Sequence, residues 1–136
     1  MTETTSLTKK TKKARESFVA DTGRTHAIDA TKKRLGKVAT EAATVLQGKD
    51  QPDYSGHVMS DVVVTIENAS KLDIPENKLR EIYQSYSGYP GGRKEETLEH
   101  LRDRLGISEV IRRTVGGMLP NNKHKKRLLK QLIITD

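Results

Sequence analysis

The chain has 136 residues, of which 33% are hydrophobic and 32% charged, with a net charge of +7 and no cysteine. This length predicts one domain with one modest core, and no apolar run approaches the roughly 18 residues that a membrane span needs. The lack of cysteine excludes disulfides and thiolate metal sites, and the Thr- and Lys-rich start lacks the apolar segment of a secretory signal. We expect a soluble intracellular protein.

The charge is unevenly distributed along the chain. Residues 1–37 carry ten Lys/Arg against four Asp/Glu, residues 38–111 eight against thirteen, and residues 112–136 seven against one. A solvated surface is the simplest interpretation of either basic end alone. Two basic ends on one small domain favour a polyanionic partner, and RNA is the most abundant one.

The first segment, residues 1–22, is predicted to be a flexible basic extension, and residues 23–136 a single domain. The extension contains the run T-K-K-T-K-K and has no apolar periodicity, so we expect it to order only against a phosphate backbone. The alternative is a tail that only improves solubility, or one added during cloning.

The first half of the domain predicts a strand, a helix and a second strand. Residues 25–30 form a short apolar strand, and apolar residues then recur at helical spacing from Leu35 to Leu46. Gly48 is a good helix stop, and residues 49–56 form a loop. Within residues 58–66, the run V-V-V-T-I is apolar at consecutive positions, which is typical of a central strand covered on both faces.

The second half predicts shorter elements. We expect residues 68–77 to be irregular and residues 95–105 to form an amphipathic helix that Gly106 ends. Residues 78–86 fit either a helix or a strand, and we favour a strand that leads into the glycine-rich segment after it. Ser108 is predicted to cap a helix that runs through Met118.

Asn121 is predicted to cap a basic helix over residues 123–131, and residues 132–135 to form a last strand. Strands that alternate with helices favour an α/β fold. We expect a three-layer α/β/α sandwich around a small, mostly parallel sheet of about four strands.

The segment 83–94, Y-Q-S-Y-S-G-Y-P-G-G-R-K, contains three of the four tyrosines and three of the ten glycines. Glycines allow positive φ angles and close backbone approach, and Pro90 stiffens the turn. Tyrosine rings suit packing against sugars or bases. One interpretation is a surface loop whose tyrosines cap the core; the other is a loop that contacts phosphate or RNA.

No pattern indicates catalysis or metal binding. The four histidines lack partners at metal-binding spacing, and the acidic residues between 95 and 103 resemble any solvated helix face. The loop lacks the G-K-[ST] ending of a P-loop. We expect no enzyme activity, no metal, no cofactor and no small-molecule substrate.

Several motifs occur in the order of a known family: I-D-A at 28–30, R-L-G-K-V-A-T-E at 34–41, V-V-V-T-I-E-N-A at 62–69, S-G-Y-P-G-G at 87–92, G-M-L-P-N at 117–121 and R-L-L-K-Q-L at 127–132. Over residues 25–134 the chain resembles the universal large-subunit ribosomal protein of the L-thirteen family, in its bacterial form. The resemblance implies a three-layer α/β/α fold and a scaffold that binds large-subunit ribosomal RNA early in assembly. It also implies neighbouring ribosomal proteins as partners and a cytoplasmic, ribosome-associated location.

The chain departs from this family at the end of the first helix, where Thr44, Val45 and Gln47 replace arginines. The RNA contacts that those arginines would make at the end of the helix therefore do not carry over. A regulator that binds RNA outside the ribosome and a small phosphate-substrate enzyme remain as rival interpretations. The residues that we expect to contact RNA are Lys9, Lys10, Lys12, Lys13, Arg34, Lys37, Lys49, Tyr54, His57, Lys78, Tyr83, Tyr86, Ser87, Gly88, Tyr89, Gly91, Gly92, Arg93, Lys94, Lys123, Lys125, Lys126, Arg127 and Lys130.

Overall fold

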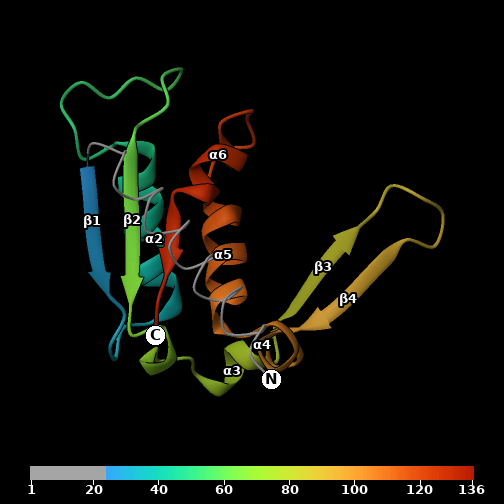
Figure 1. The fold of residues 1–136 in the computed structure, drawn as a ribbon. Helices are drawn as coiled ribbons and strands as arrows, with labels where there is room; N and C mark the ends of the chain where they lie inside the picture. Colours follow the sequence, from blue (N-terminus) through green and yellow to red (C-terminus); the bar gives the residue numbers. More distant parts are fainter. Residues whose placement is uncertain (1–23) are drawn as a thin grey trace, which may run out of the picture.

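The computed structural model describes residues 24–136, and a three-stranded parallel sheet lies at their centre (Figure 1). Its strands are β1 (Arg24–Asp29), β2 (Val62–Glu67) and β5 (Leu132–Ile134), in the order β1-β2-β5. The predicted central strand is confirmed, because β2 pairs with β1 on one side and with β5 on the other. Successive side chains alternate between the faces of a strand, and Val62, Val64 and Ile66 point into the core.

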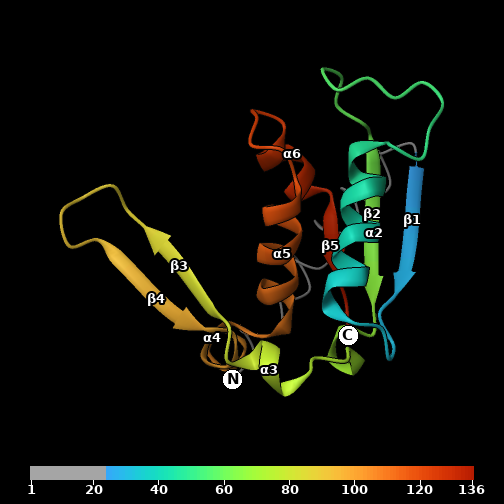
Figure 2. The same cartoon turned by 180° about the vertical axis from the view of Figure 1, so that it is seen from behind.

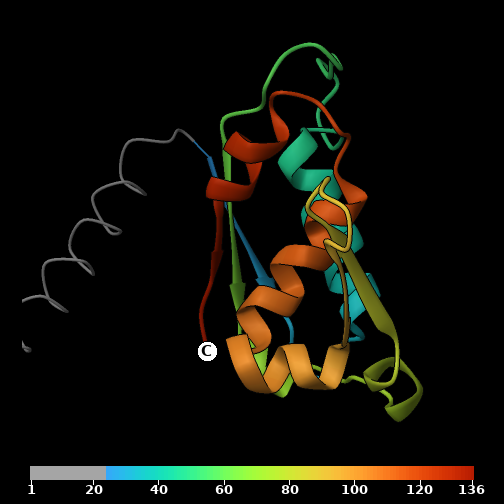
Figure 3. The same cartoon turned by 90° about the vertical axis from the view of Figure 1, so that its right-hand side faces the viewer.

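Two helices cover this inner face of the sheet, as the edge-on view in Figure 3 shows. Helix α2 (Leu35–Gln47) and helix α5 (Ile107–Met118) lie side by side on it (Figure 2). The apolar residues of α2 that recur at helical spacing are buried, as the sequence predicted. Gly48 ends α2 in the left-handed conformation, so the predicted stop is confirmed as well.

Short elements close the end of the sheet where the parallel strands finish. They are the 3-10 helix η1 (Ala69–Lys71), α3 (Glu76–Leu79) and α4 (Leu98–Leu105), while α6 (Lys125–Lys130) lies at the opposite end, before β5. Leu98 and Leu101 of α4 are fully buried, which joins this end to the main core. Within the described residues, no helix is long and apolar enough to cross a membrane.

A separate antiparallel hairpin projects from this body (Figures 1 and 2). It consists of β3 (Ile82–Tyr86) and β4 (Arg93–Thr97), which pair from Ile82 with Thr97 to Tyr86 with Arg93. The prediction of a strand that leads into the Gly-rich loop is confirmed for Ile82–Tyr86. Residues 78–81 do not belong to this strand, because Lys78 and Leu79 form the end of the short helix α3 and β3 begins only at Ile82.

The fold is mixed α/β with a small parallel sheet, as predicted, but several further details of the prediction were wrong. The described residues place three strands in the sheet instead of about four. Residues 95–97 belong to β4, and the helix begins only at Leu98, because pairing with β3 overrides the helical preference of the two glutamates. Gly106, not Ser108, precedes the first residue of α5. His124 is the residue directly before α6, and the side-chain acceptor in the preceding turn is Asn122, not the predicted Asn121.

Candidate nucleic-acid interface

The loop at the tip of the hairpin depends on glycine. Gly88 and Gly91 have φ angles of +88° and +72°, which side chains disfavour. Gly92 donates to the Tyr89 carbonyl oxygen at 2.9 Å. A Cβ atom on Gly92 would collide with Ser87 Oγ and lie 2.9 Å from that carbonyl oxygen. The S-G-Y-P-G-G motif therefore encodes a tight turn whose backbone a partner can approach closely.

The three tyrosines of the hairpin do not share one role. Tyr86 and Tyr89 are 67% and 74% exposed, so their rings are available to a partner. Tyr83 lies opposite Glu96, on the face of the hairpin that meets the body, and packs against the core. Tyr83 therefore fits the interpretation of a tyrosine that caps the core, whereas RNA contact by Tyr86 and Tyr89 stays a prediction.

The two cations of the hairpin also differ. Arg93 forms an ion pair with Glu95 at 2.6 Å on the outer face. Lys94 lies opposite Ser85 and has no ion pair among the described residues. Lys94 is therefore the hairpin cation that can bind a phosphate without first leaving a carboxylate.

A second basic group lies around α6. Asn122 Oδ1 accepts hydrogen bonds from the backbone N–H groups of His124 and Lys125, both at 3.1 Å, and thereby fixes the start of the helix. The cations of this group have no ion pair within residues 24–136. They are Lys123, Lys125, Lys126, Arg127 and Lys130.

The loop after α2 reaches this second group. Tyr54 lines a shallow pocket together with Asn122 and His124. His57 is oriented by a hydrogen bond between its Nδ1 and Ser55 Oγ at 2.8 Å. Lys49 directly follows Gly48 and is exposed. The structure therefore brings Lys49, Tyr54 and His57 to the same end of the molecule as α6.

A third group lies at the opposite end of α2. Arg34 precedes the helix and Lys37 stands in its first turn, where the partial positive charge of the helix N-terminus favours anions. No acidic residue occupies that turn. Lys78 lies in α3 and is paired with Glu81 at 3.0 Å, so it is less available than predicted.

The predicted residues therefore form a hairpin tip and two basic ends, and they do not form one continuous cluster. Lys9, Lys10, Lys12 and Lys13 lie outside the described residues. The described residues contain no group of three or more His, Asp or Glu side chains that could hold a metal ion.

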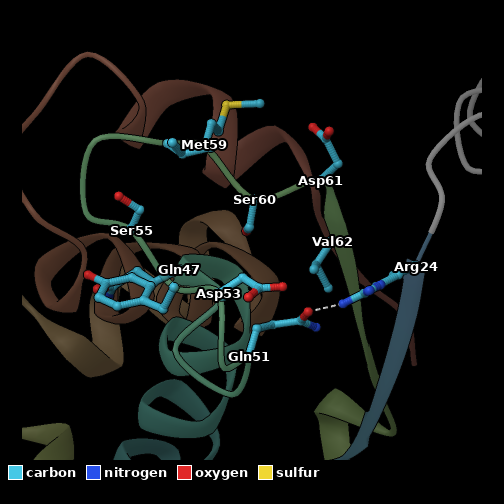
Figure 4. Close-up of a pocket in the computed structure, with 12 residues that line it drawn as sticks. Arg24, Gln47, Gln51, Asp53, Ser55, Met59, Ser60, Asp61 and Val62 are labelled. Carbon is cyan, nitrogen blue, oxygen red and sulfur yellow. Dashed lines mark hydrogen bonds between the residues drawn. The ribbon is translucent and has the colours of Figure 1, made fainter.

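A cavity of about 330 Å³ opens beside the starts of β1 and β2 (Figure 4). Arg24 of β1 donates a hydrogen bond to Gln51 across it. Asp53 and Asp61 also line the cavity, and their charges oppose a phosphate there. We interpret it as a structural junction between β1 and the loop after α2.

Two carboxylates have perturbed pKa values. Hydrogen bonds from the Thr31 side chain and backbone lower the pKa of Asp29 below its usual range. Hydrogen bonds from Arg104, and to a lesser degree from His100, lower the pKa of Glu96. The sequence pattern around Glu96 indicates a solvated helix face and gives no sign of its contacts with His100 and Arg104.

Comparisons with known proteins agree with the resemblance. The family model described as ribosomal protein L13 matches residues 23–135. The chain is 41% identical over 108 residues to the large ribosomal subunit protein uL13 of a Synechocystis species, covering 79% of this chain and 71% of that protein. It is 42% identical over 108 residues to the uL13 of a Geobacter species, covering 79% of this chain and 75% of the relative.

Proposed function

This chain belongs to the ribosomal protein L13 family, and we propose that it is a structural constituent of the large ribosomal subunit that binds and scaffolds its RNA. Its role is structural and not enzymatic. The relatives carry the name of a large-subunit protein, which supports a cytoplasmic, ribosome-associated location and translation as the process. The RNA of that subunit and neighbouring ribosomal proteins are the partners.

The hairpin tip is the observation that carries this proposal. It presents two exposed tyrosine rings, a backbone that a ligand can approach, and Lys94, which has no ion pair within residues 24–136. Rings of this kind stack on unpaired bases or pack on sugars. A small enzyme would need a convergent set of catalytic groups, whereas a scaffold needs a shaped platform of this type.

The two basic ends supply the rest of the binding. Cations around α6 and at the start of α2 lie at opposite ends of the body, so they neutralise phosphates of separate RNA segments. Such contacts give affinity with little recognition of the base sequence, because folded RNA is recognised mostly by shape and 2′-hydroxyl groups. A protein that joins separate segments is useful early in subunit assembly.

We further propose that residues 23–136 fold as one three-layer α/β/α domain. Helices α2 and α5 pack on one face of the sheet, and this packing supports two of the three layers. Residues 1–22 act as a basic extension that replaces charge missing from the end of α2, where Thr44, Val45 and Gln47 stand. Deleting residues 1–15 should then weaken RNA affinity and its salt dependence; unchanged values would refute this role.

Sucrose-gradient fractionation of native lysate, before and after a high-salt wash, tests the main proposal. Comigration with the large subunit that survives the wash is the expected result. Presence in light fractions alone would instead indicate a regulator that binds RNA outside the ribosome. Pulse labelling tests early assembly, since the protein should appear in the first large-subunit precursor particles.

A further inference from the structure

The hairpin is joined to the body at a narrow base. The backbone N–H of Leu98 donates to the Glu81 carbonyl oxygen at 3.0 Å, which closes the ends of the two strands. Two residue pairs further out, Tyr83 and Glu96 lie opposite each other across the strands, and Tyr83 packs on the core. The side chain of Glu96 is therefore placed where the hairpin meets the helices.

Glu96 is surrounded by basic side chains from the body. Arg104 binds both carboxylate oxygens, with Nε to Oε1 and Nη2 to Oε2 at 2.8 Å each. His100 Nδ1 lies 2.8 Å from Oε1, and Arg113 Nη1 lies 3.8 Å from Oε2. The glutamate side chain is 17% exposed. Bidentate geometry, low exposure and a network are the conditions under which an ion pair contributes measurably.

These partners come from two helices, so one carboxylate links three elements. His100 and Arg104 belong to α4, whereas Arg113 belongs to α5 and also binds Glu109 at 3.3 Å. Cross-linking of this kind resists rotation of the hairpin about its base. A hairpin held at its base alone would sample many directions, because two strands without further packing are only marginally stable.

Glu95 provides a contrast on the same strand. Its side chain lies on the outer face, is 48% exposed and pairs with Arg93 within β4. It makes no ion pair with the body among the described residues. Glu95 and Glu96 therefore carry the same charge at neighbouring positions, and Glu96 alone of the two connects the hairpin to α4 and α5.

We propose that Glu96 is a positioning residue that holds the β3–β4 hairpin in one orientation relative to α4 and α5. The inference rests on the proposed RNA binding, because its functional consequence is that the tip and the basic ends meet RNA in a single geometry. Apparent affinity falls in proportion to the fraction of molecules in the competent orientation. Loss of the Glu96 network thus weakens binding without removing any RNA contact.

The orientation of the hairpin can be measured directly with spin labels, because the 136-residue sequence contains no cysteine that would be labelled as well. Spin labels at Gln84→Cys on the outer face of β3 and Ser70→Cys in η1 report the distance between hairpin and body. We expect a narrow distance distribution in the parent, a broad one in Glu96→Gln, and a narrow one in Glu95→Gln. An unchanged distribution in Glu96→Gln would overturn the proposal.

Binding to a large-subunit ribosomal RNA transcript at fixed salt gives the functional readout. Glu96→Gln should weaken binding about fivefold, as expected if the competent fraction falls to about a fifth. Glu95→Gln removes the same negative charge and should leave affinity unchanged or raise it. Equal effects of the two variants would show that only net charge matters and would refute positioning.

Arg104→Gln offers a second route to the same result. It should reproduce the weakening, and the double variant with Glu96→Gln should be no weaker than either single variant, because the two residues act as a unit. Additive losses would contradict this arrangement. If the parent failed to bind RNA, the proposed function would fall, while the distance distributions would still decide whether Glu96 orients the hairpin.

Discussion

Asn68 Nδ2 donates a hydrogen bond to Asp29 Oδ1 at 3.1 Å, and this contact ties together the ends of the adjacent strands β1 and β2. The same carboxylate oxygen accepts from the Thr31 N–H and Oγ1 at 3.0 and 2.7 Å. Asn68 and Lys32 both have φ angles of +56°, so the two turns are conformationally demanding. The ionised form of Asp29 is the one that stabilises them.

Asp29→Asn should lower the melting temperature by several degrees at neutral pH. The folded pKa of Asp29 is depressed, so its stabilisation is fully present above the ordinary pKa of 3.8 and is lost as the pH falls through the lower folded value. The difference in melting temperature between variant and parent should therefore become smaller in acid. Thermal unfolding followed by circular dichroism measures it. Asp73→Asn, at an exposed position without a side-chain hydrogen bond in residues 24–136, is the control. Equal shifts for both variants would contradict the role of Asp29.

Gly48→Ala should destabilise the protein by about 1–2 kcal/mol, because a residue with a side chain is forced into the left-handed conformation. Its φ angle is +74°, and the new Cβ would lie 3.1 Å from Ser60 Cβ. Gly36→Ala in the first turn of the same helix meets nothing within 4 Å and should be neutral or stabilising by up to about 1 kcal/mol. Urea unfolding measures both. A neutral Gly48→Ala would be inconsistent with the observed C-cap.

Asn122→Ala should cost about 1 kcal/mol of stability, since it leaves two backbone N–H groups at the start of α6 without their acceptor. Asn121→Ala is the matched control, and its urea unfolding curve should overlay that of the parent. A larger loss for Asn121→Ala would restore the capping residue that the sequence suggested.

Lys126→Ala should reduce the salt dependence of RNA affinity by slightly less than one unit on a log–log plot, as expected for one lost phosphate contact. Lys126 is exposed and has no ion pair within the described part of the chain. Lys33→Ala removes a cation that is already paired with Glu41 at 3.5 Å and should change the slope less. Affinities measured by filter binding across a salt series give both slopes. Identical slopes for the two variants would argue against a phosphate contact by Lys126.

The local signals in the sequence were sufficient for the central strand of the sheet and for helix α2. The V-V-V-T-I run predicted the central strand because burial on both sides favours continuous apolar residues. The periodicity between Leu35 and Leu46, followed by Gly48, predicted α2 because both features act within one or two turns. Neither inference needed information about distant residues.

Features that depend on distant residues were not predictable. Glu95 and Glu96 resemble the first turn of a helix, but the strand that pairs with them lies across the Gly-rich loop. Gly106 separates α4 from α5 with a φ angle of +87°, so the cap that Ser108 suggested is not needed. Strand pairing and the turn between two helices are determined by tertiary contacts, which override local conformational preferences.

The candidate site also combines features that local sequence predicts with features that depend on distant residues. Sequence identified the cations and tyrosines, because residue type alone indicates affinity for nucleic acid. It did not show that Lys78 and Arg93 are engaged by carboxylates, or that Tyr83 packs inward. Intramolecular pairing is set by the fold, and it determines which of the predicted residues are free to meet RNA.

The register of the central sheet has a consequence for folding. Val64 of β2 pairs with Leu132 of β5, whereas the β3–β4 hairpin pairs residues that are close along the chain. Contacts between distant segments form slowly, because a long loop must close first, and local hairpins form within about 1–10 μs. The hairpin can therefore be in place while one edge of the V-V-V-T-I strand is still open. An open apolar edge invites pairing between chains, so refolding yield should fall as the protein concentration rises.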